Sequence, residues 1–144
     1  MAKDCCTISG YAFLIDGGAV SWSSKQQEII SLSTTKSEYI AAMHGSKEAL
    51  WLCSLISEVF SPITSPTTLF SDNQAAITLT HNHQYHLRTK HIDMQYHWIC
   101  WVVKKGSICL VYCPMDDMVA DALTKVLPSA KVKHFAASLG LHVK

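Results

Sequence analysis

Three carboxylates in this chain stand where carboxylates could do chemistry rather than only solubilise a surface. Glu38 lies on a helical stripe of small residues that includes Gly45 and Ala49, and Asp72 ends a short apolar strand in the stretch TTLFSDNQAAI. Asp121 lies among apolar neighbours in MVADALTK. Carboxylate clusters suit hard cations such as Mg²⁺ or Mn²⁺, and two such ions can activate water and stabilise a leaving oxygen. The hypothesis is that these three acids meet at one sheet edge and bind a divalent metal.

Each acid also has an ordinary structural interpretation. Glu38 would serve as a first-turn acid that the helix dipole favours, and Asp72 would serve as the N-cap of the helix that follows it. Asp121 would form a surface ion pair with Lys125, one helical turn further along. Spacing alone leaves both interpretations open for each residue.

The segments that must position these acids follow from periodicity and turn signals. The stretch YAFLIDGGAVSWS predicts a β-hairpin, and the following thirty residues, through Phe60, show a helical spacing of apolar side chains. We expect a strand over 67–72, helices over 73–81 and 90–103, and a buried strand over 108–113. Helices should follow from Asp116 or Asp117 to about Val126 and over 129–139. This order predicts a mixed α/β domain, with helices covering a sheet.

Composition narrows the class of protein. The 144 residues are enough for one domain, residues 1–144, with a hydrophobic core, and 49% of them are apolar, which excludes a disordered chain. No stretch approaches the apolar length of a membrane helix. Six cysteines occur without any C-x-x-C pair, which is typical of reduced thiols. We therefore expect an intracellular protein, cytoplasmic or nuclear, without a membrane partner.

Positive charge gathers between residues 81 and 105. This stretch carries five histidines and one acid, Asp93, together with Arg88, Lys90, Lys104 and Lys105. Aromatic residues are interleaved with them, as in many nucleic-acid-binding surfaces. A solvated helix face over an apolar core stripe would give the same composition.

Four stretches together resemble the ribonuclease H domain of Ty1/copia-type retrotransposon polyproteins. They are VSWSSKQQEIISLSTTKSEYIAAMHGSKEALWL, FSDNQAAI, HLRTKHIDMQYHWI and VYCPMDDMVADALTKVLP. The resemblance implies an RNase H-like fold, a five-stranded mixed sheet with helices on both sides. It also implies two-metal hydrolysis of the RNA strand of an RNA–DNA hybrid, with Glu38, Asp72 and Asp121 as three of the catalytic, metal-binding acids. Arg88, Lys90 and His91 would contact phosphates.

The resemblance also has gaps. The family begins with a central strand that carries a first catalytic aspartate, and no segment of this sequence matches that strand. We therefore expect impaired activity, and a sheet that is rearranged, strand-exchanged or completed in a homodimer. Asp16 is the residue that could substitute for the first acid. Lys36 stands where the family usually has an acid, and could pair with a site carboxylate and compete with a metal.

The sequence therefore predicts an RNase H-like, metal-dependent ribonuclease derived from a retrotransposon, with RNA or an RNA–DNA hybrid as its partner. Two alternatives stay open. The first is a catalytically inactive module that binds nucleic acid or protein through the 81–105 face. The second is a ribonuclease with a toxin or defence role.

Overall fold

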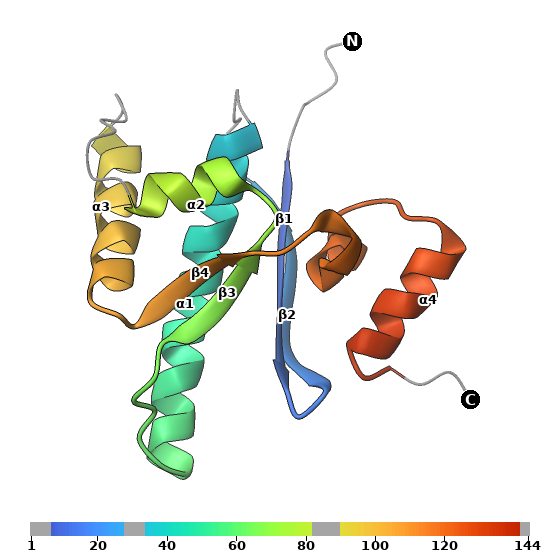
Figure 1. The fold of residues 1–144 in the computed structure, drawn as a ribbon, viewed down its shortest axis with the longest axis horizontal. Helices are drawn as coiled ribbons and strands as arrows, with labels where there is room; N and C mark the ends of the chain where they lie inside the picture. Colours follow the sequence, from blue (N-terminus) through green and yellow to red (C-terminus); the bar gives the residue numbers. More distant parts are fainter. Residues whose placement is uncertain (1–6, 28–33, 82–89, 142–144) are drawn as a thin grey trace.

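The computed structural model describes residues 7–27, 34–81 and 90–141 and shows a mixed α/β arrangement (Figure 1). The elements run in the order β1 (Ile8–Ile15), β2 (Gly18–Gln26), α1 (Thr34–Val59), β3 (Thr67–Ser71), α2 (Gln74–His81), α3 (Lys90–Lys104) and β4 (Ile108–Tyr112). Two short 3-10 turns, η1 (Met115–Asp117) and η2 (Val119–Leu123), lead to the final helix α4 (Ser129–Ser138). Among these residues no helix is both long and apolar enough to cross a membrane.

The predicted hairpin is present. β1 and β2 pair antiparallel, and Asp16 and Gly17 form the turn with φ values of 52° and 79°. Two consecutive positive φ angles give the turn a twist that matches the strands, and Asp and Gly tolerate that conformation. One face of the hairpin packs on α1, because a Cβ at Gly45 would lie 3.9 Å from the Cβ of Tyr11. The other face packs on η2 at Gly10.

The strands form two separate two-stranded sheets, so the expectation of a single mixed sheet was wrong for the described residues. β1 pairs only with β2, and β3 pairs in parallel with β4. The crossover from β3 to β4 runs through α2 and α3, as parallel strands require. Within the described ranges no strand pairs with the outer edge of β1 or β3. The hairpin does not pair with β3. Its two faces pack instead against α1 and η2. A strand exchange or a homodimer stays a prediction.

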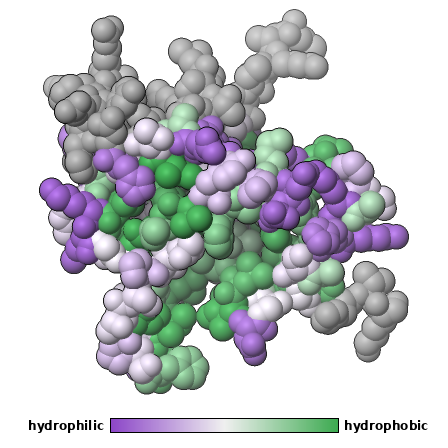
Figure 2. Space-filling view, in the orientation of Figure 1, coloured by the Kyte–Doolittle hydropathy of each residue, from purple (hydrophilic) through white to green (hydrophobic). Residues whose placement is uncertain are grey.

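Helix α1 packs against strands of both sheets and contributes to two clusters of buried side chains. Small residues along one stripe, including the buried Gly45 and Ala49, let the helix lie close to the strands. The buried side chains of the core are Tyr39, Ile40, Met43, Ala49, Ala76, Ile99, Cys100, Val102 and Ile108. At the far end of α1 Trp51, Val59 and Phe60 are exposed, and Figure 2 shows apolar surface over that part of the molecule.

The segment after β4 differs from its prediction. A single helix was expected from Asp116 or Asp117 to about Val126, but two 3-10 turns occupy this stretch. Met118 separates them with an extended backbone at φ −80° and ψ 92°, which no continuous helix accommodates. Asp121 therefore lies in a short turn that packs on the hairpin, rather than within a regular helix.

Candidate acidic site

The three predicted acids lie on three different elements. Glu38 is in α1 just beyond its first turn, so it is not the first-turn acid that was considered. Asp72 follows the last residue of β3, and Asp121 is in η2. Burial raises the pKa of Glu38 above its ordinary value of 4.5, and the charges of Asp72 and Asp121 raise it further. Charges shift a pKa in this way only at short range. The charges of Asp72 and Asp121 therefore act on Glu38, and we refer to these three carboxylates as the acidic cluster.

Asp72 does not cap α2. The Oδ1 of Asn73 accepts the backbone N–H of Ala76 at 2.9 Å, so Asn73 is the N-cap of this helix. The hydroxyl of Ser71 accepts the N–H of Asn73 at 3.3 Å and fixes the entry to the helix. The capping interpretation of Asp72 was wrong, and its carboxylate is left to face the other acids at the end of β3.

Lys125 is the cation of the cluster. Its Nζ lies 3.1 Å from Oδ2 of Asp121 and 3.9 Å from Oδ2 of Asp72. The predicted ion pair of Asp121 with Lys125 is thus confirmed, and a second contact that the sequence did not indicate joins Lys125 to Asp72. Lys125 also acts on Glu38, because its positive charge lowers the pKa that burial and the two aspartates raise. One ammonium group therefore offsets part of the negative charge of all three acids.

The donor set has the right chemistry for a hard cation, since it consists of carboxylate oxygens. Its present spacing is wider than that of a bound site: among the described residues, no three His, Cys, Asp or Glu side chains are close enough to hold a metal ion as they stand. Two of the acids contact the ammonium of Lys125 instead. Binding of Mg²⁺ or Mn²⁺ by Glu38, Asp72 and Asp121 would require these side chains to draw together.

Cys113 also borders the cluster, and sequence reasoning missed it. It follows β4, and its backbone N–H donates to the carbonyl of Ser71 at 2.9 Å, next to Asp72. Burial raises the pKa of its thiol, and so do the charges of Asp117, Asp72 and Asp121. The signal was present in the sequence, because the ends of two parallel strands lie side by side and both are followed by polar residues.

Asp16 is not part of this cluster. It lies exposed in the hairpin turn, and the charges that shift Glu38 belong to Asp72, Asp121 and Lys125. A turn position with a positive φ cannot slide into the place of a strand without losing the hairpin. The structure thus places Asp16 in the hairpin turn, and its substitution for a missing acid stays an untested prediction.

The predicted nucleic-acid contacts are only partly described. Arg88 lies outside the described residues, as do the side chains of Lys36, Lys90 and His91. Lys104 and Lys105 are exposed at the end of α3, where Lys105 Nζ lies 4.9 Å from the centre of the Trp101 ring. They precede β4, whereas Asp72 follows its parallel partner β3, so a five-residue strand, about 16 Å long, separates them from the acids.

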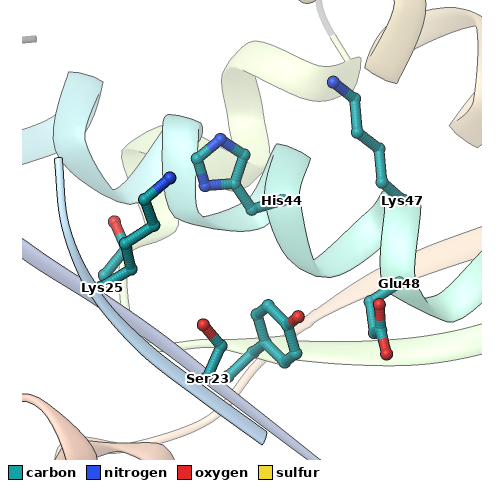
Figure 3. Close-up of a pocket in the computed structure, with 7 residues that line it drawn as sticks. Ser23, Lys25, His44, Lys47 and Glu48 are labelled. Atoms are coloured by element: carbon teal, nitrogen blue, oxygen red, sulfur yellow. The ribbon is translucent and has the colours of Figure 1, made fainter. Parts of the chain in front are cut away.

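A hollow lies between the hairpin and α1, with a volume of about 330 Å³ (Figure 3). Its lining is mixed in charge and includes Lys25, His44 and Glu48, and it shares no residue with the acidic cluster. Ser21 donates to Glu48 at 2.7 Å, and burial together with Lys47 and Lys25 lowers the pKa of His44. Lys47 points away from the strands, with its Nζ 5.8 Å from the Trp98 ring centre.

Comparison with known proteins finds relatives over nearly the whole chain. It is 41% identical over 134 residues to the retrovirus-related Pol polyprotein from transposon TNT 1-94 of Nicotiana tabacum, which is 93% of this chain and 10% of that protein. It is 35% identical over 138 residues to the corresponding polyprotein from transposon RE1 of Arabidopsis thaliana, covering 96% and 9%. A 46-residue stretch is 50% identical to secreted RxLR effector protein 161 of Plasmopara viticola, which is 32% of each chain.

The chain is therefore homologous to a segment of retrovirus-related Pol polyproteins from transposons, and it spans about a tenth of the length of those relatives. No protein-family profile matches it. No solved structure matches it significantly.

Proposed function

We propose that this chain is an RNase H-like domain of Ty1/copia retrotransposon origin that hydrolyses RNA phosphodiesters, with Glu38, Asp72 and Asp121 holding Mg²⁺ or Mn²⁺. The homology to transposon Pol polyproteins supports the origin. The ribonuclease activity and the RNase H-like fold go beyond this homology and are our proposal.

The observation that carries the proposal is the acidic cluster, with three acids from three elements. Asp72 and Asp121 are far apart in sequence, yet their Oδ2 atoms lie 3.9 Å and 3.1 Å from the same ammonium, that of Lys125. The charges of both aspartates also raise the pKa of Glu38. Packing three carboxylates together costs free energy, and such an arrangement is typical of a site that receives a cation. A purely structural set of acids would instead lie in solvent, as Asp116 does with 86% of its side chain exposed.

The roles follow from the chemistry of the groups. The carboxylates would ligate the metal, which when bound polarises an attacking water and stabilises the departing oxygen of the RNA strand. Lys104 and Lys105 would contact phosphates of the nucleic acid away from the acids, and the resemblance implies phosphate contacts for Arg88, Lys90 and His91 as well. Recognition of an RNA–DNA hybrid would rest on backbone shape and 2′-hydroxyls rather than on base edges.

We expect the hydrolysis to be slow in a protein of these 144 residues. They supply three acids to the cluster, and the resemblance implies a fourth. Loss of one electrostatic group at an active site commonly costs about a hundredfold or more in rate. The pairing of Lys125 with two of the acids favours a second candidate, a module that binds nucleic acid without cleaving it.

The test is cleavage of a labelled RNA–DNA hybrid in Mg²⁺ or Mn²⁺. We expect slow release of RNA fragments, abolished by EDTA and by Asp72→Asn. The matched control is Asp116→Asn, because Asp116 also pairs with a lysine, Lys131 at 3.0 Å, but lies outside the cluster. Salt-sensitive binding without cleavage would support the binding module. Cleavage that persists in Asp72→Asn would exclude the proposed site.

A further inference from the structure

Lys125 reaches the acidic cluster from its solvent side. It follows η2, and its backbone N–H donates to the carbonyl of Asp121 at 2.9 Å, which places the two side chains one helical turn apart on the same side. The side chains of Asp72 and Asp121 are each 13% exposed, whereas that of Lys125 is 45% exposed. The ammonium therefore lies at the mouth of the cluster, with the acids behind it.

The ammonium of Lys125 lies where it can reduce the repulsion between the carboxylates. Three ionised carboxylates carry three negative charges, and repulsion between Asp72 and Asp121 would push their side chains apart. Lys125 contacts both through Oδ2 atoms, and the positive charge of its Nζ also acts on Glu38. A divalent cation bound by the same oxygens would have to occupy the space beside this ammonium, and two positive charges at about 4 Å repel each other strongly.

We propose that Lys125 is a tethered counter-ion, which holds Asp72 and Asp121 together when no metal is bound and competes with a divalent cation for their carboxylates. This inference rests on the proposed function, because it concerns the same metal site. Nearly half of the side chain is in solvent, so the ammonium can swing out into water at little cost in desolvation when a metal enters. Lys125 is then a positioning residue, and its competition with the metal lowers the affinity of the site for the divalent cation.

The test compares Mn²⁺ binding, measured by electron paramagnetic resonance, in the unmodified chain and in Lys125→Met. Methionine keeps most of the aliphatic length and removes the charge. We expect Lys125→Met to bind Mn²⁺ about tenfold more tightly, since a positive charge near the metal is gone. Lys131→Met is the matched control: Lys131 is 43% exposed and pairs with Asp116 at 3.0 Å, and its loss should leave Mn²⁺ affinity unchanged.

A second readout does not involve metal affinity. In EDTA, Lys125→Met should melt at a lower temperature than the unmodified chain, because the acids lose their counter-ion, and saturating Mn²⁺ should remove this difference. Lys125→Arg, which retains the charge, should restore the melting temperature in EDTA.

The outcomes separate the two proposals. If Lys125→Met binds Mn²⁺ no more tightly than the unmodified chain, while Asp72→Asn abolishes binding, the counter-ion role is wrong and the metal site stands. If neither the unmodified chain nor Lys125→Met binds Mn²⁺, the metal site itself is wrong, and the competition falls with it. An equal gain in Lys131→Met would show a general effect of net charge, and would also overturn the role of Lys125.

Discussion

The side chain of Asn73 accepts the backbone N–H of Ala76 at 2.9 Å and thereby relieves its neighbour Asp72 of the capping role. Two adjacent polar residues at the end of β3 thus have separate tasks. Asn73 begins a helix, and Asp72 faces Lys125 and the other acids. This division of roles leads directly to a pair of opposite mutational effects.

Asp72→Asn and Asn73→Ala should separate metal binding from stability. Asp72→Asn should abolish Mn²⁺ binding and change the free energy of unfolding by less than about 1 kcal/mol, since it removes both a repulsion and an ion pair. Asn73→Ala should cost about 1 kcal/mol of unfolding free energy, the usual effect of losing an N-cap, and should retain Mn²⁺ binding. Urea unfolding and Mn²⁺ titration of both variants measure this. The reverse pattern would show that Asp72 has a structural role.

The raised pKa of Glu38 predicts a dependence of stability on pH. A carboxyl whose pKa is higher in the folded state than in the unfolded state contributes stability at low pH, and that contribution is lost as pH rises through the folded-state pKa. Glu38→Gln should therefore be more stable than the unmodified chain at pH 7 in EDTA. The difference should shrink as pH falls through the folded-state pKa toward 4.5, the ordinary value for this group, and should be absent below 4.5.

Denaturant unfolding of the two proteins at several pH values measures this difference. A constant difference between pH 4 and pH 7 would show that ionisation of Glu38 is not its cause. Saturating Mn²⁺ at pH 7 should reverse the order of stability, because the ionised glutamate is then a ligand and glutamine is a poorer one.

The contact between β1 and η2 should matter for the position of Asp121. A Cβ added at Gly10 would lie 2.5 Å from Cγ2 of Thr124, so Gly10→Ala must displace the side chain of Thr124. Thr124 lies between Asp121 and Lys125 in sequence, so we expect those two residues to shift with it. We expect Gly10→Ala to lower both the melting temperature and the Mn²⁺ affinity.

Gly45→Ala is the matched control for this prediction. It also adds a methyl group between β1 and a neighbouring element, but its nearest contact is an ordinary 3.9 Å to the Cβ of Tyr11. Gly45 lies within α1, where alanine is favoured over glycine, so Gly45→Ala should raise stability by about 0.5–1 kcal/mol and leave metal binding unchanged. If Gly10→Ala is no less stable than Gly45→Ala, η2 moves freely away from the hairpin and the prediction is wrong.

Much of the fold could be predicted from the sequence, because its elements have strong local signals. The hairpin has a two-residue turn between apolar strands, and α1 has a long helical spacing and a small-residue stripe that includes Gly45 and Ala49. The observed bounds of β3, α2, α3, β4 and α4 lie within two residues of the expected ones. These signals are local, and the structure agrees with them.

What failed to follow from the sequence depended on details beyond local periodicity. The separation of the strands into two sheets depends on which strand edges form hydrogen bonds with each other, and strand pairing is a property of the tertiary structure. The break at Met118 follows from one extended residue in a segment with otherwise helical spacing. The contact of Lys125 with Asp72 joins positions far apart in the chain, and nothing in either stretch indicates it.

The meeting of the three acids is the part of the candidate site that spacing could only suggest. Each of Glu38, Asp72 and Asp121 had an ordinary role available, and only Asp121 retains it, in its ion pair with Lys125. The resemblance to a known family pointed to the same three residues, and in the structure the charges of Asp72 and Asp121 act on Glu38. That the three residues form a metal site stays a prediction. Competition for the acids was expected from Lys36, whereas Lys125 is the cation that the described residues place there.

The most direct test of the central claim is anomalous diffraction from a crystal of this chain soaked in Mn²⁺. We predict an anomalous peak between the carboxylates of Glu38, Asp72 and Asp121, at oxygen distances of about 2.2 Å, with the ammonium of Lys125 displaced toward solvent. A fully soaked crystal with no peak at these three side chains, and with Lys125 still between Asp72 and Asp121, would contradict the claim that they form a metal site.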